Sequence, residues 1–227
     1  MALSSRSIDT VVLDIDGTLL DSVYAHVWSW HEAFRVLGLQ VPSWKIHRTV
    51  GMGGDRLVGA VTNDAVEAAL GDEVRSRQGD LYADLSAHLA PTCGATALLE
   101  ELKARGLTVA LATSGSRRDA ENAVSTLDGW GWVDALVSGD DSEATKPDDE
   151  PVRRAVERVG GHRAVVVGDA VWDMEAARRA GHTPVGLLTG GIARAELVDA
   201  GAVAVHQDPS ALTEALDDVL DATLVDR

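Results

Sequence analysis

The sequence predicts an α/β fold, with a parallel sheet between two layers of helices and a block of helices inserted near the N-terminus. Two observations predict it. After residue 91, short apolar runs alternate with helical patterns, and repeated βα units form parallel sheets that are covered on both faces. Before that point, an apolar run at residues 8–14 is followed by a long stretch, 22–90, with no comparable β-branched run.

The elements follow in a regular order. The first strand is predicted over residues 8–14, and residues 22–90 are predicted as helices because apolar residues recur near helical spacing. Pro42 and the glycines within residues 51–54 divide this block, and one helix is predicted to end at Gly71. The later elements are helix 94–105, strand 107–112, helix 116–127, strand 133–138, helix 149–159, strand 163–168, helix 172–180, strand 183–187, a short helix, strand 203–206 and a terminal helix 209–220.

A pair of carboxylates closes the first strand, in the motif Asp14-Ile15-Asp16-Gly17-Thr18. Because side chains alternate along a strand, Asp14 and Asp16 start on the same face. Like charges this close repel each other unless a cation or a shared proton relieves them. The pair can therefore supply a nucleophile, an acid or base and metal ligands together.

Three further polar motifs each follow a later apolar strand. They are Thr113-Ser114-Gly115, Lys146-Pro147, and Gly168-Asp169 with Asp173 one helical turn further on. In an open parallel sheet, ligands bind outside the carboxyl ends of the strands, so we expect all four motifs to converge at one edge. Thr113-Ser114-Gly115 alone is equally typical of a helix N-cap. The order of the four motifs, rather than any one of them, indicates a site.

These four motifs, in this order and spacing, resemble the haloacid dehalogenase superfamily of aspartate-nucleophile phosphohydrolases. The likeness covers nearly the whole chain and is greatest to the phosphoglycolate phosphatase and beta-phosphoglucomutase group. It implies a Rossmann-like three-layer core of residues 1–20 and 89–227, with a helical cap domain of residues 21–88 inserted between hinges near 20–22 and 88–92. It also implies an Mg²⁺-dependent phosphomonoesterase that hydrolyses a small ester of the phosphoglycolate or sugar phosphate type.

The resemblance further implies a role for each motif residue. Asp14 is the expected nucleophile that forms an aspartyl-phosphate, Asp16 the general acid and base, and Lys146 the partner of nucleophile and phosphate. The expected Mg²⁺ ligands are Asp14, the Asp16 backbone carbonyl and Asp169, with Asp173 in the outer shell or bound through water. The expected phosphate-binding groups are the Thr113 hydroxyl and the N–H groups of Ser114 and Gly115. We expect Asp14 and burial to raise the pKa of Asp16 unless Mg²⁺ offsets this effect.

The helical insert offers three more candidates for substrate binding. Arg48 and Arg56, together with His47, bracket the glycine-rich turn at residues 51–54, which could reach over the catalytic edge. His26 lies ten residues after Asp16, the spacing of a histidine in the beta-phosphoglucomutase pattern. Two alternatives to the phosphatase therefore stay open. One is a phosphomutase that uses the same aspartyl-phosphate, and the other is a non-catalytic binding module that keeps the fold.

Composition restricts the partners. A net charge of -16 at pH 7 argues against nucleic acid or an anionic membrane surface as a partner. The single cysteine excludes an intrachain disulfide and fits a reducing compartment. The start of the chain is polar, without a signal-peptide pattern, and no apolar stretch reaches about 18 residues. We expect a cytoplasmic protein, a monomer by default, whose partner is a small-molecule phosphate ester.

Overall fold

The computed structural model describes residues 8–222, and its centre is a six-stranded parallel sheet. The strand order is β3-β2-β1-β4-β5-β6. The strands are β1 Thr10–Leu13, β2 Thr108–Ala112, β3 Ala135–Val137, β4 Ala164–Gly168, β5 Thr183–Leu187 and β6 Ala204–His206. Each overlaps the run predicted for it, which confirms the α/β fold with a parallel sheet. The polar start, residues 1–7, and residues 223–227 lie outside the described range.

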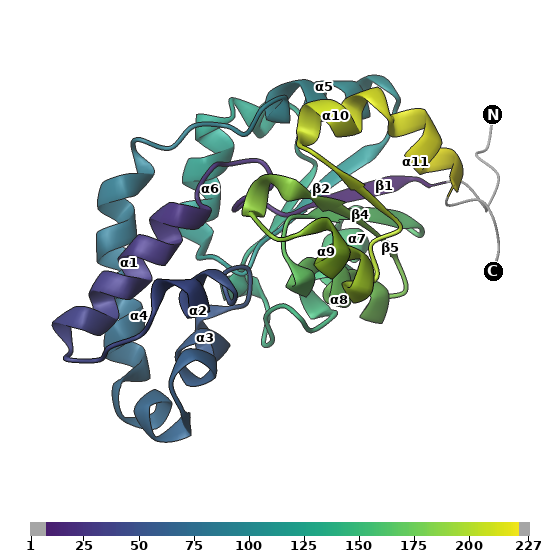
Figure 1. Cartoon of the computed structure of the whole chain (residues 1–227). Coiled ribbons are helices and arrows are strands. Elements are labelled where there is room, and N and C mark those ends of the chain that lie inside the picture. The colour runs from purple at the N-terminus through teal and green to yellow at the C-terminus, as the bar shows by residue number, and fades with distance from the viewer. Residues whose placement is uncertain (1–7, 223–227) are drawn as a thin grey trace.

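Helices cover both faces of the sheet (Figure 1). Val11 and Leu13 of β1 pack on one face, in a cluster with the helices α5 Ala95–Ala104, α6 Arg117–Thr126, α10 Pro209–Glu214 and α11 Leu216–Ala222. Val12 packs on the opposite face with α7 Glu150–Arg158 and α8 Val171–Arg179. α9 Arg194–Ala200 adds a smaller cluster beside α8. β1 is thus buried on both sides, as a continuous apolar run in a central parallel strand predicts.

Four helices lie between β1 and α5: α1 Val23–Val36, α2 Ser43–His47, α3 Gly54–Val61 and α4 Asp64–Ser86. They enclose a hydrophobic cluster of their own and stand beside the sheet in Figure 1. The prediction that a helix ends at Gly71 is wrong, because α4 continues through it. The ion pair between Glu67 and Arg75, at 2.8 Å, lies where a side chain at residue 71 would be. Packing of α4 on α1 and α3 outweighs the roughly 1 kcal/mol that a helical glycine costs.

The two predicted hinge segments lie side by side. The Asp21 N–H donates to the Ala90 carbonyl at 2.9 Å, and the Thr92 N–H donates to the Leu19 carbonyl at 2.9 Å. The chain therefore leaves the sheet layer and returns to it at one place. The division into a core of residues 1–20 and 89–227 and a cap of residues 21–88 stays a prediction.

The C-terminal end departs from the prediction in one detail. Instead of a single helix over 209–220, two helices, α10 and α11, follow each other with Ala215 between them. Both still bury apolar residues under the same face of the sheet. Within residues 8–222, no helix combines the length and the apolar character needed to cross a bilayer.

Candidate active site

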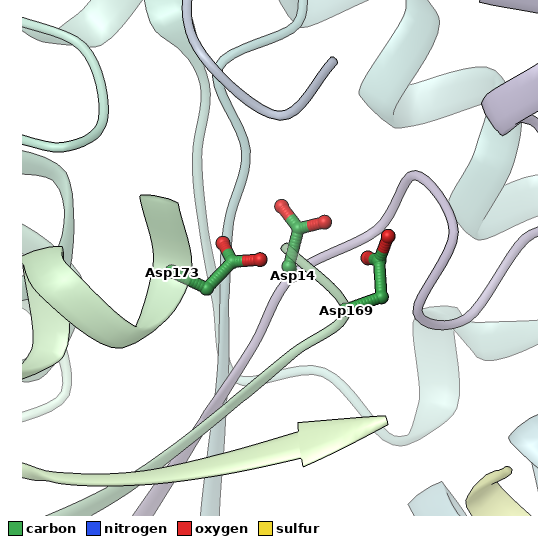
Figure 2. A group of neighbouring side chains, drawn as sticks. All are labelled: Asp14, Asp169 and Asp173. Atoms are coloured by element: carbon green, nitrogen blue, oxygen red, sulfur yellow. The ribbon is translucent and has the colours of Figure 1, made fainter. Parts of the chain in front are cut away.

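Three aspartates meet where β1 and β4 end. Asp14 follows β1, Asp169 follows β4, and Asp173 lies in the first turn of α8. β2 and β3 lie on one side of β1, and β4, β5 and β6 lie on the other. The order of the strands therefore reverses between β1 and β4, which makes this a switch point, where ligands bind in open sheets. The three residues are buried, and one carboxylate oxygen from each lies within 4.8 Å of the others (Figure 2). The first and fourth motifs therefore converge, as the sequence predicts.

Lys146 joins two of these carboxylates. Its Nζ lies 2.5 Å from Asp14 Oδ1 and 2.7 Å from Asp173 Oδ1, and the side chain is only 2% exposed. Burial alone would lower the pKa of Lys146, but the charges of Asp14 and Asp173 outweigh it and raise the pKa. The lysine therefore stays protonated, and the third motif also belongs to the cluster.

The cluster has an excess of negative charge. Three buried carboxylates face one ammonium group. Burial raises the pKa of Asp14 to about 7 although Lys146 opposes the rise, and burial next to Asp173 and Asp14 raises the pKa of Asp169. A divalent cation would relieve this excess, and an all-oxygen donor set is the kind that Mg²⁺ prefers. The residues present therefore fit a divalent metal ion.

Two glycines make room for Asp169. A Cβ on Gly17 would lie 2.3 Å from Asp169 Oδ2, and one on Gly190 would lie 2.0 Å from it. Gly17 also has a φ of 82°, which glycine adopts without strain. Thr18 completes the setting, because its hydroxyl donates to Asp169 Oδ1 at 2.8 Å. Gly17 and Thr18 of the first motif thus place Asp169 of the fourth motif, Gly17 by leaving room for it and Thr18 by its hydrogen bond.

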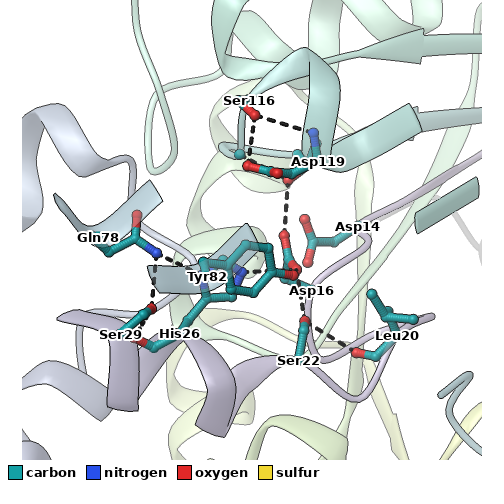
Figure 3. A network of polar contacts seen from close by, with 12 residues as sticks. Asp14, Asp16, Leu20, Ser22, His26, Ser29, Gln78, Tyr82, Ser116 and Asp119 are labelled. Atoms are coloured by element: carbon teal, nitrogen blue, oxygen red, sulfur yellow. Dashed lines mark hydrogen bonds and ion pairs between the residues drawn. The ribbon is translucent and has the colours of Figure 1, made fainter. Parts of the chain in front are cut away.

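Asp16 lies beside the cluster and is held from the helical insert (Figure 3). Its Oδ1 accepts from Ser22 Oγ at 2.7 Å, His26 Nε2 at 3.0 Å and Tyr82 Oη at 3.3 Å. Burial alone would raise the pKa of Asp16, but the charge of His26 and the hydrogen bonds from His26, Ser22 and Tyr82 lower it to about 2. The prediction of a raised pKa is wrong because it considered Asp14 and burial but not these donors.

A pocket of about 620 Å³ opens over these groups. Asp14, Asp16 and residues 113–116 line it from the sheet side, while α1, α3, α4 and the turn at residues 50–52 line it from the helical insert. In the second motif, the Gly115 N–H donates to Thr113 Oγ1 at 3.0 Å. Ser114 Oγ donates to the Gly51 carbonyl at 3.2 Å, which ties the motif to the insert. The second motif therefore reaches the same site as the others.

The predicted residues of the insert divide into two groups. His26 contacts Asp16 and lines the pocket, and its role in substrate binding stays a prediction. Arg48 pairs with Glu196 and Arg56 pairs with Asp148, and the structure does not bring either arginine into the pocket lining. Their positive charges are already partnered across the contact between the insert and the sheet domain.

The sequence reasoning missed several residues of the site. Ser22 and Tyr82 donate to Asp16, and Gln78 contacts His26. Tyr82 and Gln78 lie four residues apart, which places them on one face of a helix. That spacing is the single local signal for them, since contacts between residues 66 and 52 positions apart leave no pattern in the sequence.

Comparison with known proteins agrees with this geometry. A family model described as haloacid dehalogenase-like hydrolase matches residues 8–181. Validoxylamine A 7'-phosphate phosphatase from Streptomyces hygroscopicus subsp. limoneus is 31% identical over 192 residues, which cover 78% of this chain and 84% of that protein. Phosphoglycolate phosphatase from Vibrio vulnificus (strain CMCP6) is 29% identical over 238 aligned positions, covering 98% of this chain and 99% of that protein. The crystal structure of a hydrolase from Pseudomonas syringae superposes with a TM-score of 0.88 and 34% identity, covering 92% of this chain and 98% of that one.

Proposed function

This chain belongs to the haloacid dehalogenase-like hydrolase family and is a phosphatase, and on that premise we propose that it is an Mg²⁺-dependent phosphomonoesterase acting on a small phosphate ester. One observation carries the proposal. Asp14, which lines the pocket, belongs to a buried group of three carboxylates that a single lysine joins, and a further aspartate, Asp16, lines the pocket beside it. Such a set can attack phosphorus, neutralise the phosphate and exchange a proton with the leaving group.

Asp14 is the proposed nucleophile. Its carboxylate oxygen attacks phosphorus, the bond from phosphorus to the leaving oxygen breaks, and an aspartyl-phosphate forms. Lys146, 2.5 Å from Asp14, holds the nucleophile and balances the negative charge that the phosphate brings. Water then attacks the same phosphorus, which restores Asp14 and releases inorganic phosphate.

Asp16 is the proposed acid and base. It gives a proton to the leaving oxygen in the first step and takes one from the attacking water in the second. A pKa of about 2 leaves Asp16 ionised. A phosphate dianion bound beside it raises that pKa, since a like charge disfavours the ionised form, and so favours the protonated acid that the first step needs.

Asp14 and Asp169 are the proposed carboxylate ligands of the cation, together with the Asp16 backbone carbonyl, and Asp173 supports them. When bound, Mg²⁺ would supply positive charge at the phosphoryl oxygens. Thr113, Ser114 and Gly115 remain the proposed phosphate-binding groups, because they line the pocket next to Asp14. The helical insert, residues 21–88, is proposed as a cap that limits access of bulk water to this site.

The pocket lining favours a leaving group without an acidic substituent. Beyond Asp14 and Asp16, five more acidic residues line it: Asp55, Asp80, Asp119, Asp140 and Glu143. Of the two arginines in the lining, Arg75 is paired with Glu67 and Asp72. By their names, two relatives act on phosphoglycolate and on validoxylamine A 7'-phosphate. We expect a polyhydroxylated, sugar-type leaving group to react faster here than phosphoglycolate, whose carboxylate the lining repels.

Phosphate release from a panel of esters, with Mg²⁺ and with EDTA, tests this function. The panel contains phosphoglycolate and the glucose phosphates, and the products are examined for isomerised sugar phosphate as well. Metal-dependent release from one ester far above the rest supports the proposal. Conversion of one glucose phosphate to its isomer with little free phosphate would contradict it in favour of the mutase.

A further inference from the structure

The carboxylate of Asp16 has two unequal oxygens. Oδ1 receives three donors, from Ser22, His26 and Tyr82, whereas Oδ2 has one long contact, with Thr113 Oγ1 at 3.4 Å. A carboxylate oxygen offers about two lone-pair directions, so three donors saturate Oδ1. Oδ2 is therefore the oxygen that is left to hold or release a proton toward the pocket.

Ser22 contacts Asp16 instead of capping the helix that it precedes. It is the N-cap residue of α1, where a serine side chain usually accepts from a backbone N–H of the first turn. Here the side chain makes no capping hydrogen bond, and its hydroxyl donates to Asp16 instead. The start of α1 is thus connected to Asp16 rather than to its own backbone.

Gln78 determines which nitrogen of His26 carries a proton. Ser29 Oγ donates to the His26 carbonyl at 3.0 Å, so its oxygen must accept from the Gln78 amide nitrogen at 3.1 Å. The same amide nitrogen faces His26 Nδ1 at 3.4 Å, so in the neutral imidazole Nδ1 is the acceptor. Nε2 then carries the hydrogen that points to Asp16, and the contact between the two side chains is the dashed line that joins them in Figure 3.

Tyr82 acts on Asp16 directly. Its side chain is 3% exposed, and its ring stacks on His26 with centroids 3.9 Å apart and an interplanar angle of 9°. Removing the hydroxyl alone would leave this stack in place. Tyr82 and Gln78 both belong to α4, which is far from Asp16 in the sequence.

We propose that Tyr82 and Gln78 are positioning residues that hold Oδ1 of Asp16, so that Oδ2 exchanges the proton with the leaving group. The inference rests on the proposed acid-base role of Asp16. Tyr82 acts through its hydroxyl, and Gln78 acts through the tautomer of His26. Misplacing a reacting group by about an ångström lowers rates by up to about 10²-fold, so loss of one donor has a measurable effect.

The test compares two esters that differ in their need for an acid. An alkyl ester, the fastest of the panel above, leaves as an alkoxide that must be protonated, whereas p-nitrophenyl phosphate has a leaving group that is stable as the anion. The rate to compare is that of the first step, measured as leaving-group release within a single turnover, because the later attack of water on the aspartyl-phosphate is common to both esters. In Tyr82→Phe, this rate should fall about tenfold for the alkyl ester, a fraction of the about 10²–10⁴-fold contribution of a positioned acid. For p-nitrophenyl phosphate, the same rate should change less than about twofold, because its leaving group needs no proton. Gln78→Met should give the same pattern and serves as the second variant.

Matched controls separate the explanations. Tyr24→Phe alters the other tyrosine, which is 65% exposed and whose hydroxyl makes no hydrogen bond within residues 8–222, and it should behave as wild type. In the same single-turnover assay, Asp16→Asn should slow leaving-group release from the alkyl ester far more than release from p-nitrophenyl phosphate. If it does not, the acid-base role itself fails. If Asp16→Asn shows that pattern but Tyr82→Phe slows both esters equally, or neither, the positioning proposal is overturned while the proposed function stands.

Discussion

Replacing Asp14 by asparagine should stabilise the metal-free protein while abolishing turnover. Asp14 is buried among other carboxylates, which raises its pKa from 3.8 to about 7. An acid whose pKa is higher in the folded state is destabilising when ionised. At 1.36 kcal/mol for each pKa unit, this rise corresponds to an upper limit of about 4 kcal/mol. The substitution also removes the ion pair between Asp14 and Lys146. Lys146 keeps its second partner, because its Nζ lies 2.7 Å from Asp173 Oδ1. We therefore expect a gain of about 1–3 kcal/mol, or roughly 2–4 °C in Tm per kcal/mol for a chain of this size.

The destabilisation by ionised Asp14 depends on pH. The penalty is absent below pH 3.8, grows as the pH rises toward 7, and is complete above 7. Urea denaturation in EDTA at pH 8 should therefore show the gain, and the same experiment at pH 4 should show little of it. Asp16→Asn is a matched control with the opposite sign: its pKa is lowered to about 2, so the variant should lose roughly 1–2 kcal/mol at pH 8. An Asp14→Asn protein no more stable than wild type in EDTA at pH 8, or equally stabilised at pH 4, would refute this reasoning.

Two further substitutions test other parts of the structure. Burial would raise the pKa of Asp141, but hydrogen bonds from Ser138, Arg117 and Arg158 hold it well below its usual value. Asp141→Asn should therefore lower the free energy of unfolding by about 1–3 kcal/mol at pH 7. In urea denaturation, this difference from wild type should shrink as the pH falls below 3.8. An equal difference at pH 7 and at pH 2 would contradict the assignment. Gly17→Ala places a Cβ 2.3 Å from Asp169 Oδ2 and should weaken Mg²⁺ binding in calorimetry at least tenfold, about 1.4 kcal/mol. Gly38→Ala shares a positive φ but has open space around it, so unchanged Mg²⁺ affinity there separates the clash from backbone strain.

Much of this fold could be predicted because its signals are local. Apolar runs and the polar residues that end them predict β1, β4 and the sheet edge where Asp14 and Asp169 meet. The predicted helix end at Gly71 is wrong because α4 packs along α1 and α3. Such tertiary packing stabilises a helix through a glycine at which it would otherwise end. The terminal helix was placed correctly, although its division at Ala215 was not anticipated.

The site was less predictable where it depends on distant contacts. The lowered pKa of Asp16 comes from Ser22, His26 and Tyr82, and the last of these is 66 positions away in the sequence. Arg48 and Arg56 looked available as free cations in the sequence, yet each meets a carboxylate from another part of the chain. Charge pairing across the insert leaves no local pattern, so a motif cannot reveal whether an arginine faces the substrate.

The most direct test of the central claim is to find where the phosphoryl group rests during turnover. The fastest ester of the panel, labelled in its phosphate with ³²P, is mixed with the enzyme and Mg²⁺, quenched in acid within one turnover and mapped by peptide. We expect label on the peptide that contains Asp14, and neither label nor phosphate release in Asp14→Asn. Label on another residue, or undiminished release by Asp14→Asn, would contradict the central claim.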